Sequence, residues 1–429
     1  MAEDNDPNYN TRLEFIQDTL KKRFDLQELP TITPSQYYPK HAYRCKNFIY
    51  RIIFSSPPSP PSTLQPGCTP ISPNTTTFIM RLANPLTTSP NSSKSLIENE
   101  VAMTTLASSA LSAFTPSIVP QIYAWSSATS SDYGWTLQQL MPGKHLDRDW
   151  DSTGAYARVG QRVMLAQIAS IVKALQDYEL PESIVGFGDV EFDDGGRIVS
   201  VVKKAGEMAS WGSFEEFYRE RLERAIRKAD GSRYIEGWRA NGVRERLDEF
   251  MDRGLGKMFE GLEDREWKTI VHGDLTTENV MYDPETAQVT ALLDWDSAVV
   301  LHPSYEFLRS FGDLGGELNG WYEEEAFSEQ SLLREAKLFG FPPDAYSTQD
   351  QPFWDVAVAW EEELETHDVK RPRIMKGIEQ VADVEALLRG VLPWNISDET
   401  ARLRSAHSVW RDRRTFEDNL SDLLDYLGF

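Results

Sequence analysis

The pattern of hydrophobic and polar positions divides the chain into a strand-rich first third and a longer helical remainder. Runs of β-branched and aromatic residues bounded by turn residues predict strands. In the first third these strands cover residues 47–54, 75–82, 118–125 and 134–140. Apolar residues at helical spacing predict two helices, one at 10–24 with Asn10 or Thr11 as its N-cap, and one at 95–107.

The remainder of the chain is predicted to be mostly helical, with one β-hairpin at residues 280–293. Its helices are expected at 156–178, 214–228, 242–259, 327–339, 354–365, 381–392 and 408–427. This order predicts an α+β fold with a small β-rich N-terminal lobe, residues 1–141, and a larger helical C-terminal lobe, residues 142–429. Met141-Pro142-Gly143 is the expected hinge between them. The Pro/Ser-rich residues 55–74 are expected to form a flexible insertion without a packed element.

Composition narrows the classes of protein that the chain can belong to. A length of 429 residues suits two lobes, and a net charge of −23 argues against non-specific nucleic-acid binding. No apolar run approaches the length of a membrane span, and the N-terminus lacks the pattern of a signal peptide. Cys45 and Cys68 cannot form a disulfide framework or a cysteine-based metal site. We therefore expect a cytoplasmic protein.

Candidate chemistry is concentrated between residues 271 and 296. In an antiparallel hairpin with strand-like runs at 279–282 and 289–293, Asn279 at the start of one strand would lie opposite Asp294 at the end of the other. An amide oxygen and a carboxylate are hard ligands suited to Mg²⁺. Asp274 lies on the loop that enters the hairpin, where its carboxylate could accept the proton of a substrate hydroxyl. His272 is placed in the same catalytic loop, where we expect it to brace the loop by hydrogen bonding.

Together these residues match the catalytic-loop pattern of kinases, a His-x-Asp-Leu-x-x-x-Asn segment followed by a metal-binding Asp. The chain here resembles the aminoglycoside phosphotransferase and choline kinase-like family, which shares the protein-kinase fold. The resemblance implies a catalytic Asp at Asp274 and magnesium ligands at Asn279 and Asp294. It rests on these residues: His272-Gly273-Asp274-Leu275, Asn279 and Leu292-Leu293-Asp294-Trp295-Asp296. Gly273 in place of Arg, Trp295 in place of Phe-Gly, and the lack of a downstream Ala-Pro-Glu segment favour the small-molecule branch.

The resemblance also implies a nucleotide site in the first third of the chain. Arg81 stands where the family's third strand carries a phosphate-binding cation, more usually Lys, and an Arg keeps the charge with a different reach. Glu100 is its expected partner on the following helix, with Glu98 as the alternative. The backbone carbonyl of Gln139 and the backbone N–H of Met141 would meet the adenine edge.

One departure from the family lies in the loop expected to cover the phosphates. Residues 42–47 contain no glycine, so close backbone approach to phosphate is less favoured, and Arg44 or Lys46 would supply charge instead.

Acidic and aromatic residues suggest an amine-bearing acceptor, with carboxylates as counter-charges and rings to stack on a sugar or face a quaternary ammonium. The alternative is a set of amphipathic helices with solvated acids and core tryptophans. The residues concerned are Glu306, Asp313, Glu323, Glu324, Glu325, Glu361, Glu362, Glu363 and Glu365, with Trp321, Tyr322, Trp354 and Trp360.

The leading hypothesis from the sequence is a kinase that uses ATP or GTP with Mg²⁺ to phosphorylate a hydroxyl of a small molecule. The partners are then a nucleotide and a small hydroxylated acceptor, with no nucleic acid and no membrane span. A catalytically silent kinase-like fold that serves as a binding or scaffold protein is the alternative, and protein kinase activity is a third.

Overall fold

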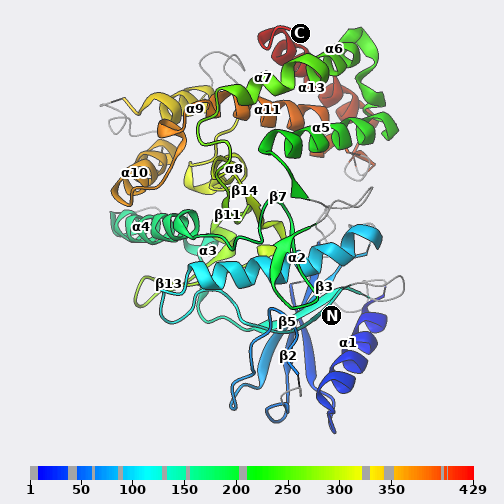
Figure 1. Ribbon diagram of the computed structural model, residues 1–429, viewed down its shortest axis with the longest axis vertical. Helices are drawn as coiled ribbons and strands as arrows, with labels where there is room; N and C mark the ends of the chain where they lie inside the picture. Colours follow the sequence, from blue (N-terminus) through cyan, green and yellow to red (C-terminus); the bar gives the residue numbers. More distant parts are fainter. Residues whose placement is uncertain are drawn as a thin grey trace.

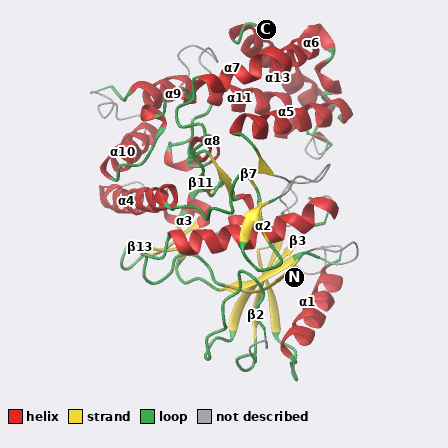
Figure 2. Cartoon of the chain, in the orientation of Figure 1, coloured by secondary structure: helices red, strands yellow, loops and turns green. Residues whose placement is uncertain are grey.

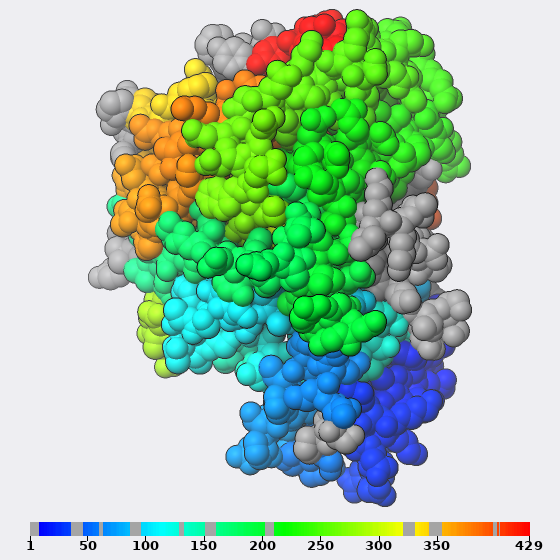
Figure 3. Space-filling view, viewed as in Figure 1, coloured from blue at the N-terminus to red at the C-terminus, as the bar shows by residue number. Residues whose placement is uncertain are grey.

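The computed structural model describes most of the chain as two lobes (Figure 1). The narrow end carries an antiparallel sheet and the broad end is built from helices, as the colours of Figure 2 show. Figure 3 shows the same outline as a solid surface, with the early part of the chain, coloured blue, at the narrow end. The predicted α+β fold class, with an antiparallel sheet in the N-terminal region and helices in the C-terminal region, is confirmed. The described residues are 8–36, 46–59, 63–85, 90–127, 133–150, 155–201, 210–320, 329–342, 352–397, 401–402 and 404–429.

The sheet of the N-terminal lobe has five antiparallel strands in the order β1-β2-β3-β5-β4. Alternation along β3 sends Phe78, Met80 and Leu82 into a core shared with the helix α1, so Arg81 faces the opposite side of the sheet. The helix α2 lies between the sheet and the helical lobe (Figure 1). These elements are α1 (Tyr9–Phe24), β1 (Thr31–Gln36), β2 (Asn47–Ile53), β3 (Thr77–Ala83), α2 (Pro90–Ala110), β4 (Ile122–Ser126) and β5 (Trp135–Gln139).

Two predictions for the start of the chain were incomplete or wrong. Helix α1 begins one residue earlier than predicted, and its N-cap is Asn8 without a side-chain cap, not Asn10 or Thr11. The strand β1 was not predicted, because Pro34 interrupts its pattern. It is an edge strand that pairs only with β2, and an edge is where a sheet tolerates proline.

The Pro/Ser-rich segment has no helix or strand in its described residues, 55–59 and 63–74, but it is held against the sheet. The N–H of Thr69 donates to the carbonyl of Ile122 (2.8 Å), and Gln65 Nε2 donates to the carbonyl of Trp125 (3.0 Å). Gly67 lies so close to α2 that a Cβ would come 2.6 Å from Val101. Backbone and amide hydrogen bonds therefore anchor a segment whose composition predicted a free loop.

The C-terminal lobe contains the predicted helices with shifted ends. The helix expected at 242–259 is divided into α6 and α7 by a π-helical turn, Phe250–Gly254. The helices are α3 (Asp147–Trp150), α4 (Ala155–Asp177), α5 (Phe214–Gly231), α6 (Val243–Glu249), α7 (Leu255–Glu260), α8 (Ser304–Arg309), α9 (Glu329–Phe339), α10 (Pro352–Thr366), α11 (Ile378–Val391) and α13 (Ala406–Tyr426). None of the described helices is long and apolar enough to cross a membrane.

Short strands in the C-terminal lobe form small sheets under the helices, and together they position the loops of the site. One sheet has the order β13-β12-β6 and a second has the order β10-β7-β14-β11, while β8 pairs with β9. Only the hairpin of β12 and β13 was predicted. The strands are β6 (Lys144–His145), β7 (Phe187–Gly188), β8 (Val190–Phe192), β9 (Ile198–Ser200), β10 (Ser210–Trp211), β11 (Thr269–Val271), β12 (Val280–Asp283), β13 (Gln288–Leu292) and β14 (Val299–Leu301).

Candidate active site

The hairpin of β12 and β13 brings Asn279 and Asp294 together. Val280 pairs with Leu292, and the N–H of Leu293 donates to the carbonyl of Asn279 (2.8 Å). Asp294 has a φ of 61°, a left-handed conformation that is uncommon for a residue with a side chain. The turn at Asp294 thus ends the hairpin and starts a short 3-10 turn, Trp295–Ser297.

Asp274 lies beside this hairpin and is linked directly to Asn279. Asn279 Nδ2 donates to the backbone carbonyl of Asp274 (2.8 Å) and to its carboxylate Oδ2 (3.3 Å). No described residue donates to the remaining amide oxygen, Asn279 Oδ1. Burial raises the pKa of Asp274, and the carboxylates of Asp294 and Asp296 add to the rise, while His272 and Lys46 oppose it.

Gly273 is required by the path of the loop. Its φ is +74°, and a Cβ would lie 2.7 Å from the backbone oxygen of Ser297. A side chain at this position would push the loop away from the residues after Asp294. This is a physical reason for Gly where protein kinases carry Arg.

His272 is fully buried and braces the loop. Its Nδ1 accepts from the N–H of Asp274 (3.3 Å), so its Nε2 carries the proton and donates to the carbonyl of Leu293 (2.8 Å). The ring also packs on Trp295, with 4.7 Å between ring centroids. Such a buried ring holds the catalytic loop to the hairpin, and it offers no atom to a substrate.

Glu306 also holds the catalytic loop in place. Its carboxylate accepts from the N–H groups of His272 (2.6 Å) and Gly273 (3.0 Å) and from the hydroxyl of Ser310 (2.5 Å). Ser310 in turn accepts from the N–H of Leu275 (2.9 Å). The sequence placed Glu306 among candidate acceptor-binding acids, but it is only 4% exposed and its hydrogen bonds are made within the loop.

Asp313 has a comparable role. It accepts from the backbone N–H of Thr277 (2.6 Å) and also bonds the hydroxyl of that residue. Sequence reasoning therefore missed the anchoring function of Glu306 and Asp313. No local pattern signals these roles, because both acids bind backbone N–H groups more than thirty residues away in the sequence.

Replacing Glu306 by Gln is expected to disorder the catalytic loop. In Gln an NH₂ group replaces one of the two carboxylate oxygens. The backbone N–H of either His272 or Gly273 would then face a hydrogen-bond donor instead of an acceptor. We expect the free energy of unfolding to fall by roughly 2–4 kcal/mol and turnover to fall about tenfold or more. Denaturant titration and steady-state kinetics measure both. Glu335→Gln, on the exposed side of α9, is the matched control and should change neither.

Arg81 links the N-terminal lobe to the hairpin. It is 5% exposed, and its guanidinium contacts Glu100 (Nη1, 3.0 Å), Asp294 (Nη2, 2.5 Å) and Asp296 (Nη2, 3.7 Å). Burial raises the pKa of Asp294, but Arg81 outweighs burial and holds that pKa below its usual value. Glu100, the first of the two partners considered from the sequence, is therefore the one that Arg81 contacts. Glu98 instead accepts from the N–H of Phe192 (3.1 Å).

Lys46 and the first residue of β2, Asn47, also reach the residues after Asp294. Lys46 Nζ contacts Asp296 (3.2 Å) and the hydroxyl of Ser297 (3.0 Å), and Asn47 Nδ2 donates to Asp296 (3.1 Å). Lys46 thus brings a positive charge to the site from the position just before β2. Arg44, the other cation considered, lies outside the described residues.

The expected hinge follows β5. Gln139 lies in β5, where its N–H donates to the carbonyl of Gln121 (2.8 Å). Met141 is buried and packs with Met281, Ala291 and the partly buried Leu293. The hydroxyl of Thr290 donates to the carbonyl of Pro142 (2.6 Å), which ties the hinge to the hairpin.

Several other acids and rings proposed for the acceptor have structural roles. Glu361 pairs with Arg371 (2.6 Å), Arg162 pairs with Glu362 and Glu363, and Trp354 and Trp360 are buried. The core-helix alternative therefore applies to these residues. Trp321, Tyr322 and Glu323 to Glu325 lie outside the described residues.

Comparison with known proteins decides the family. The model of the "Phosphotransferase enzyme family" matches residues 72–339, more than half of the chain. The chain belongs to the phosphotransferase enzyme family. This phosphotransferase has no match among curated proteins. The matched range includes Arg81, Glu100, the hinge, Asp274, Asn279 and Asp294.

Solved structures similar to this phosphotransferase include small-molecule kinases. An ethanolamine kinase from Plasmodium vivax is 12% identical over 99% of this chain and 90% of its own, with a TM-score of 0.47. An aminoglycoside phosphotransferase bound to GDP and kanamycin is 10% identical over 97% and 99%, with a TM-score of 0.45. An aminoglycoside phosphotransferase from Streptomyces rimosus is 13% identical over 83% and 98%, with a TM-score of 0.37. The family match identifies the protein as a phosphotransferase, and small-molecule kinases are among the solved structures similar to it.

Proposed function

We propose that this kinase transfers the γ-phosphate of ATP or GTP to a hydroxyl group of a small molecule, with Asp274 as the general base. The observation that carries the proposal is the grouping of Asp274, Asn279, Asp294 and Arg81 around one loop and one hairpin. Asp274 and Asn279 are hydrogen-bonded to each other, and Arg81 contacts Asp294. Phosphoryl transfer needs mostly positioning and charge stabilisation, and this set supplies both.

Each residue has a separate task in the proposed reaction. Asp274 accepts a hydrogen bond from the acceptor hydroxyl, orients it and takes its proton as the bond to phosphorus forms. Arg81 is a fixed cation for the phosphate oxygens, and Glu100 positions it. The carbonyl of Gln139 and the N–H of Met141 are proposed to meet the base of the nucleotide. His272 and Glu306 position the loop without touching the substrate.

Asn279 and Asp294 are proposed to hold Mg²⁺. The fit rests on their chemistry, since Asn279 Oδ1 accepts from no described residue and the Asp294 side chain is 37% exposed. The described residues contain no group of three or more His, Cys, Asp and Glu side chains that could hold a metal. Two oxygen ligands suit Mg²⁺, which fills its shell with water and phosphate. When bound, the ion would neutralise phosphate charge and orient the phosphates.

The domain division and location are also proposals. We place the lobe boundary at 141/142, because the sheet ends at Gln139 and the hinge follows. The two-cysteine composition supports a cytoplasmic location.

Thermal shift with Mg²⁺ and nucleotide tests the proposal against a silent kinase-like fold. We expect Mg-ATP or Mg-GTP to raise the melting temperature, because a ligand that binds only the folded state stabilises it. The same protein is then assayed for ADP or GDP release with an acceptor panel. Amine-bearing alcohols and amino sugars form one half of the panel, and neutral polyols form the other. No shift and no turnover would support the silent fold.

A further inference from the structure

A cavity of about 240 Å³ lies directly behind the catalytic loop. Gly273, which precedes the proposed base, and Asp296 form part of its wall. The opposite wall includes Arg221 and Arg224 of α5. Asp189, which directly follows the strand β7, also lines the cavity. Gly273 is the chain neighbour of Asp274, so the cavity borders the catalytic loop next to the proposed base.

Asp189 is the unusual group in this cavity. It is 6% exposed, and no described residue donates a hydrogen bond to its carboxylate. The positive charge of Arg224 opposes the effect of burial, but burial outweighs it and raises the pKa of Asp189 to about 7. A buried carboxylate without donors is unfavourable, so a ligand that brings a donor to it gains binding free energy.

The positive groups of the cavity have partners of their own. Arg221 and Arg309 both contact the buried carboxylate of Glu385, at 3.1 and 3.3 Å. The described lining residues include equal numbers of arginines and acids. The three guanidinium groups are those of Arg221, Arg224 and Arg309, and the three carboxylates are those of Asp189, Glu220 and Asp296. The lining side chains thus offer hydrogen-bonding groups of both kinds, and their own formal charges sum to zero.

Aromatic side chains complete the walls. Trp211 and Phe217 pack edge to face, with 5.2 Å between ring centroids, and Tyr305 packs on Phe217 at 5.4 Å. All three line the cavity. Rings beside paired acids and arginines suit a molecule with apolar C–H faces and several hydroxyl groups.

We propose that this cavity binds the non-reacting part of a neutral, polyhydroxylated acceptor, and that a second hydroxyl of the acceptor donates a hydrogen bond to Asp189. The proposal rests on the proposed kinase function and names the substrate class of that site. It departs from the amine-bearing acceptor expected from the sequence, because several of the acids behind that expectation are engaged elsewhere.

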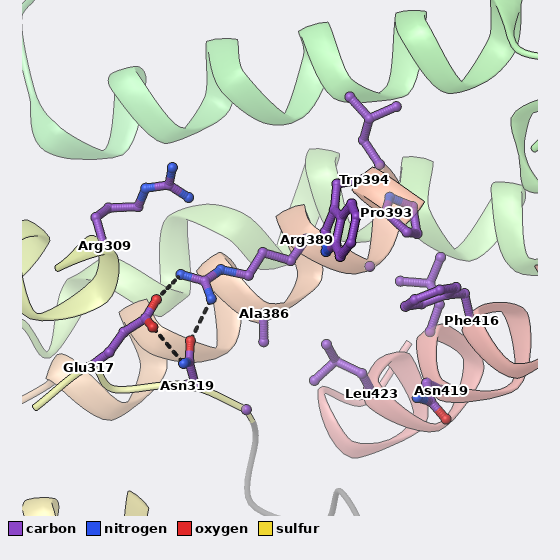
Figure 4. Close-up of a pocket in the computed structure, with 14 residues that line it drawn as sticks. Arg309, Glu317, Asn319, Ala386, Arg389, Pro393, Trp394, Phe416, Asn419 and Leu423 are labelled. Carbon is purple, nitrogen blue, oxygen red and sulfur yellow. Dashed lines mark hydrogen bonds and ion pairs between the residues drawn. The ribbon is translucent and has the colours of Figure 1, made fainter. Parts of the chain in front are cut away.

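A second hollow of about 750 Å³ shares Arg309 as a lining residue with the cavity. Figure 4 shows Arg389 of α11 reaching Glu317 in this hollow, with Trp394 farther along the same wall. The Arg389–Glu317 contact is 2.7 Å. Arg309 is the one described lining residue that the two hollows share, and a disaccharide in the test panel measures whether a longer acceptor is used.

The test measures phosphate transfer to matched neutral and amine-bearing compounds. The wild type is assayed with glucose, ribose, myo-inositol, glycerol and maltose, and with glucosamine, ethanolamine and choline. We expect a neutral polyol to give the highest kcat/KM. Transfer only to the amines, or a higher kcat/KM for glucosamine than for every polyol, overturns the inference but keeps the kinase function. Transfer to no compound overturns the proposed function, and the inference with it.

Asp189 is then tested with the best polyol. Asp189→Ala is expected to raise the acceptor KM about tenfold or more and to change kcat less than threefold. Asp189→Asn keeps a carbonyl oxygen that can accept from a hydroxyl, so its KM should lie between those of Ala and wild type. Glu191→Gln, on the neighbouring strand β8 and away from the cavity lining, is the control with unchanged KM. A fall in kcat at constant KM in both Asp189 variants would indicate a structural role and overturn the inference.

Discussion

Asp274→Asn is expected to lower kcat by about 10³-fold while nucleotide binding is retained. The amide has nearly the shape of the carboxylate but cannot take the proton of the acceptor hydroxyl. Nucleotide contacts are proposed for other residues, so the thermal shift with Mg-ATP should persist. Glu278→Gln, an exposed residue of the same loop, is the control and should keep the wild-type rate.

The pH profile of kcat/KM gives a second readout of the same residue. Burial raises the pKa of Asp274, and a base works only when deprotonated. Activity should therefore fall as the pH decreases, and the fall should begin at a higher pH than for an ordinary aspartate. Full activity of Asp274→Asn, or a flat acid limb in the wild type, would contradict the assignment.

The substitution Arg81→Met is expected to have the second large effect, on both stability and nucleotide kinetics. Met removes the cation that contacts Glu100, Asp294 and Asp296, so three carboxylates face one another without it. Removing one partner of a buried ion pair costs about 3–5 kcal/mol, and we expect a loss of unfolding free energy of that order. The kcat/KM for nucleotide should fall by about 10²-fold, because the phosphates also lose a fixed positive charge.

Two further variants distinguish charge from packing at this position. Arg81→Lys keeps the charge but lacks the two-donor fork that reaches Glu100 and Asp294 together, so it should show intermediate activity. Arg51→Met, on the exposed side of β2, is the control for loss of a cation from the same sheet. Unchanged nucleotide kinetics in Arg81→Met would show that Arg81 serves the fold alone.

Local patterns explain why the hairpin and the grouping of Asp274, Asn279 and Asp294 could be predicted. A turn between two strand-like runs determines which residues lie opposite each other, so the pair was visible in the sequence. The Arg81–Glu100 contact was predictable only through family resemblance, because one residue lies on a strand and the other on a helix. The additional contact of Arg81 with Asp294 depends on how the two lobes approach each other.

Roles that depend on tertiary contacts were beyond the sequence. Glu306 looks like an exposed helical acid in the sequence, yet it is buried and accepts from the loop backbone more than thirty residues away. Strands β7, β10 and β14 have two or three residues, too few for a recognisable period. Asp189 follows one of these strands, so its position in the cavity could not be anticipated.

Phosphorus NMR of a reaction with Mg-ATP and an accepted alcohol tests the central claim most directly. The account predicts that the γ-phosphate signal is lost as a phosphomonoester signal appears at the same rate, and that Asp274→Asn shows neither change on that timescale. Release of inorganic phosphate alone, or equal phosphomonoester formation by wild type and Asp274→Asn, would contradict it.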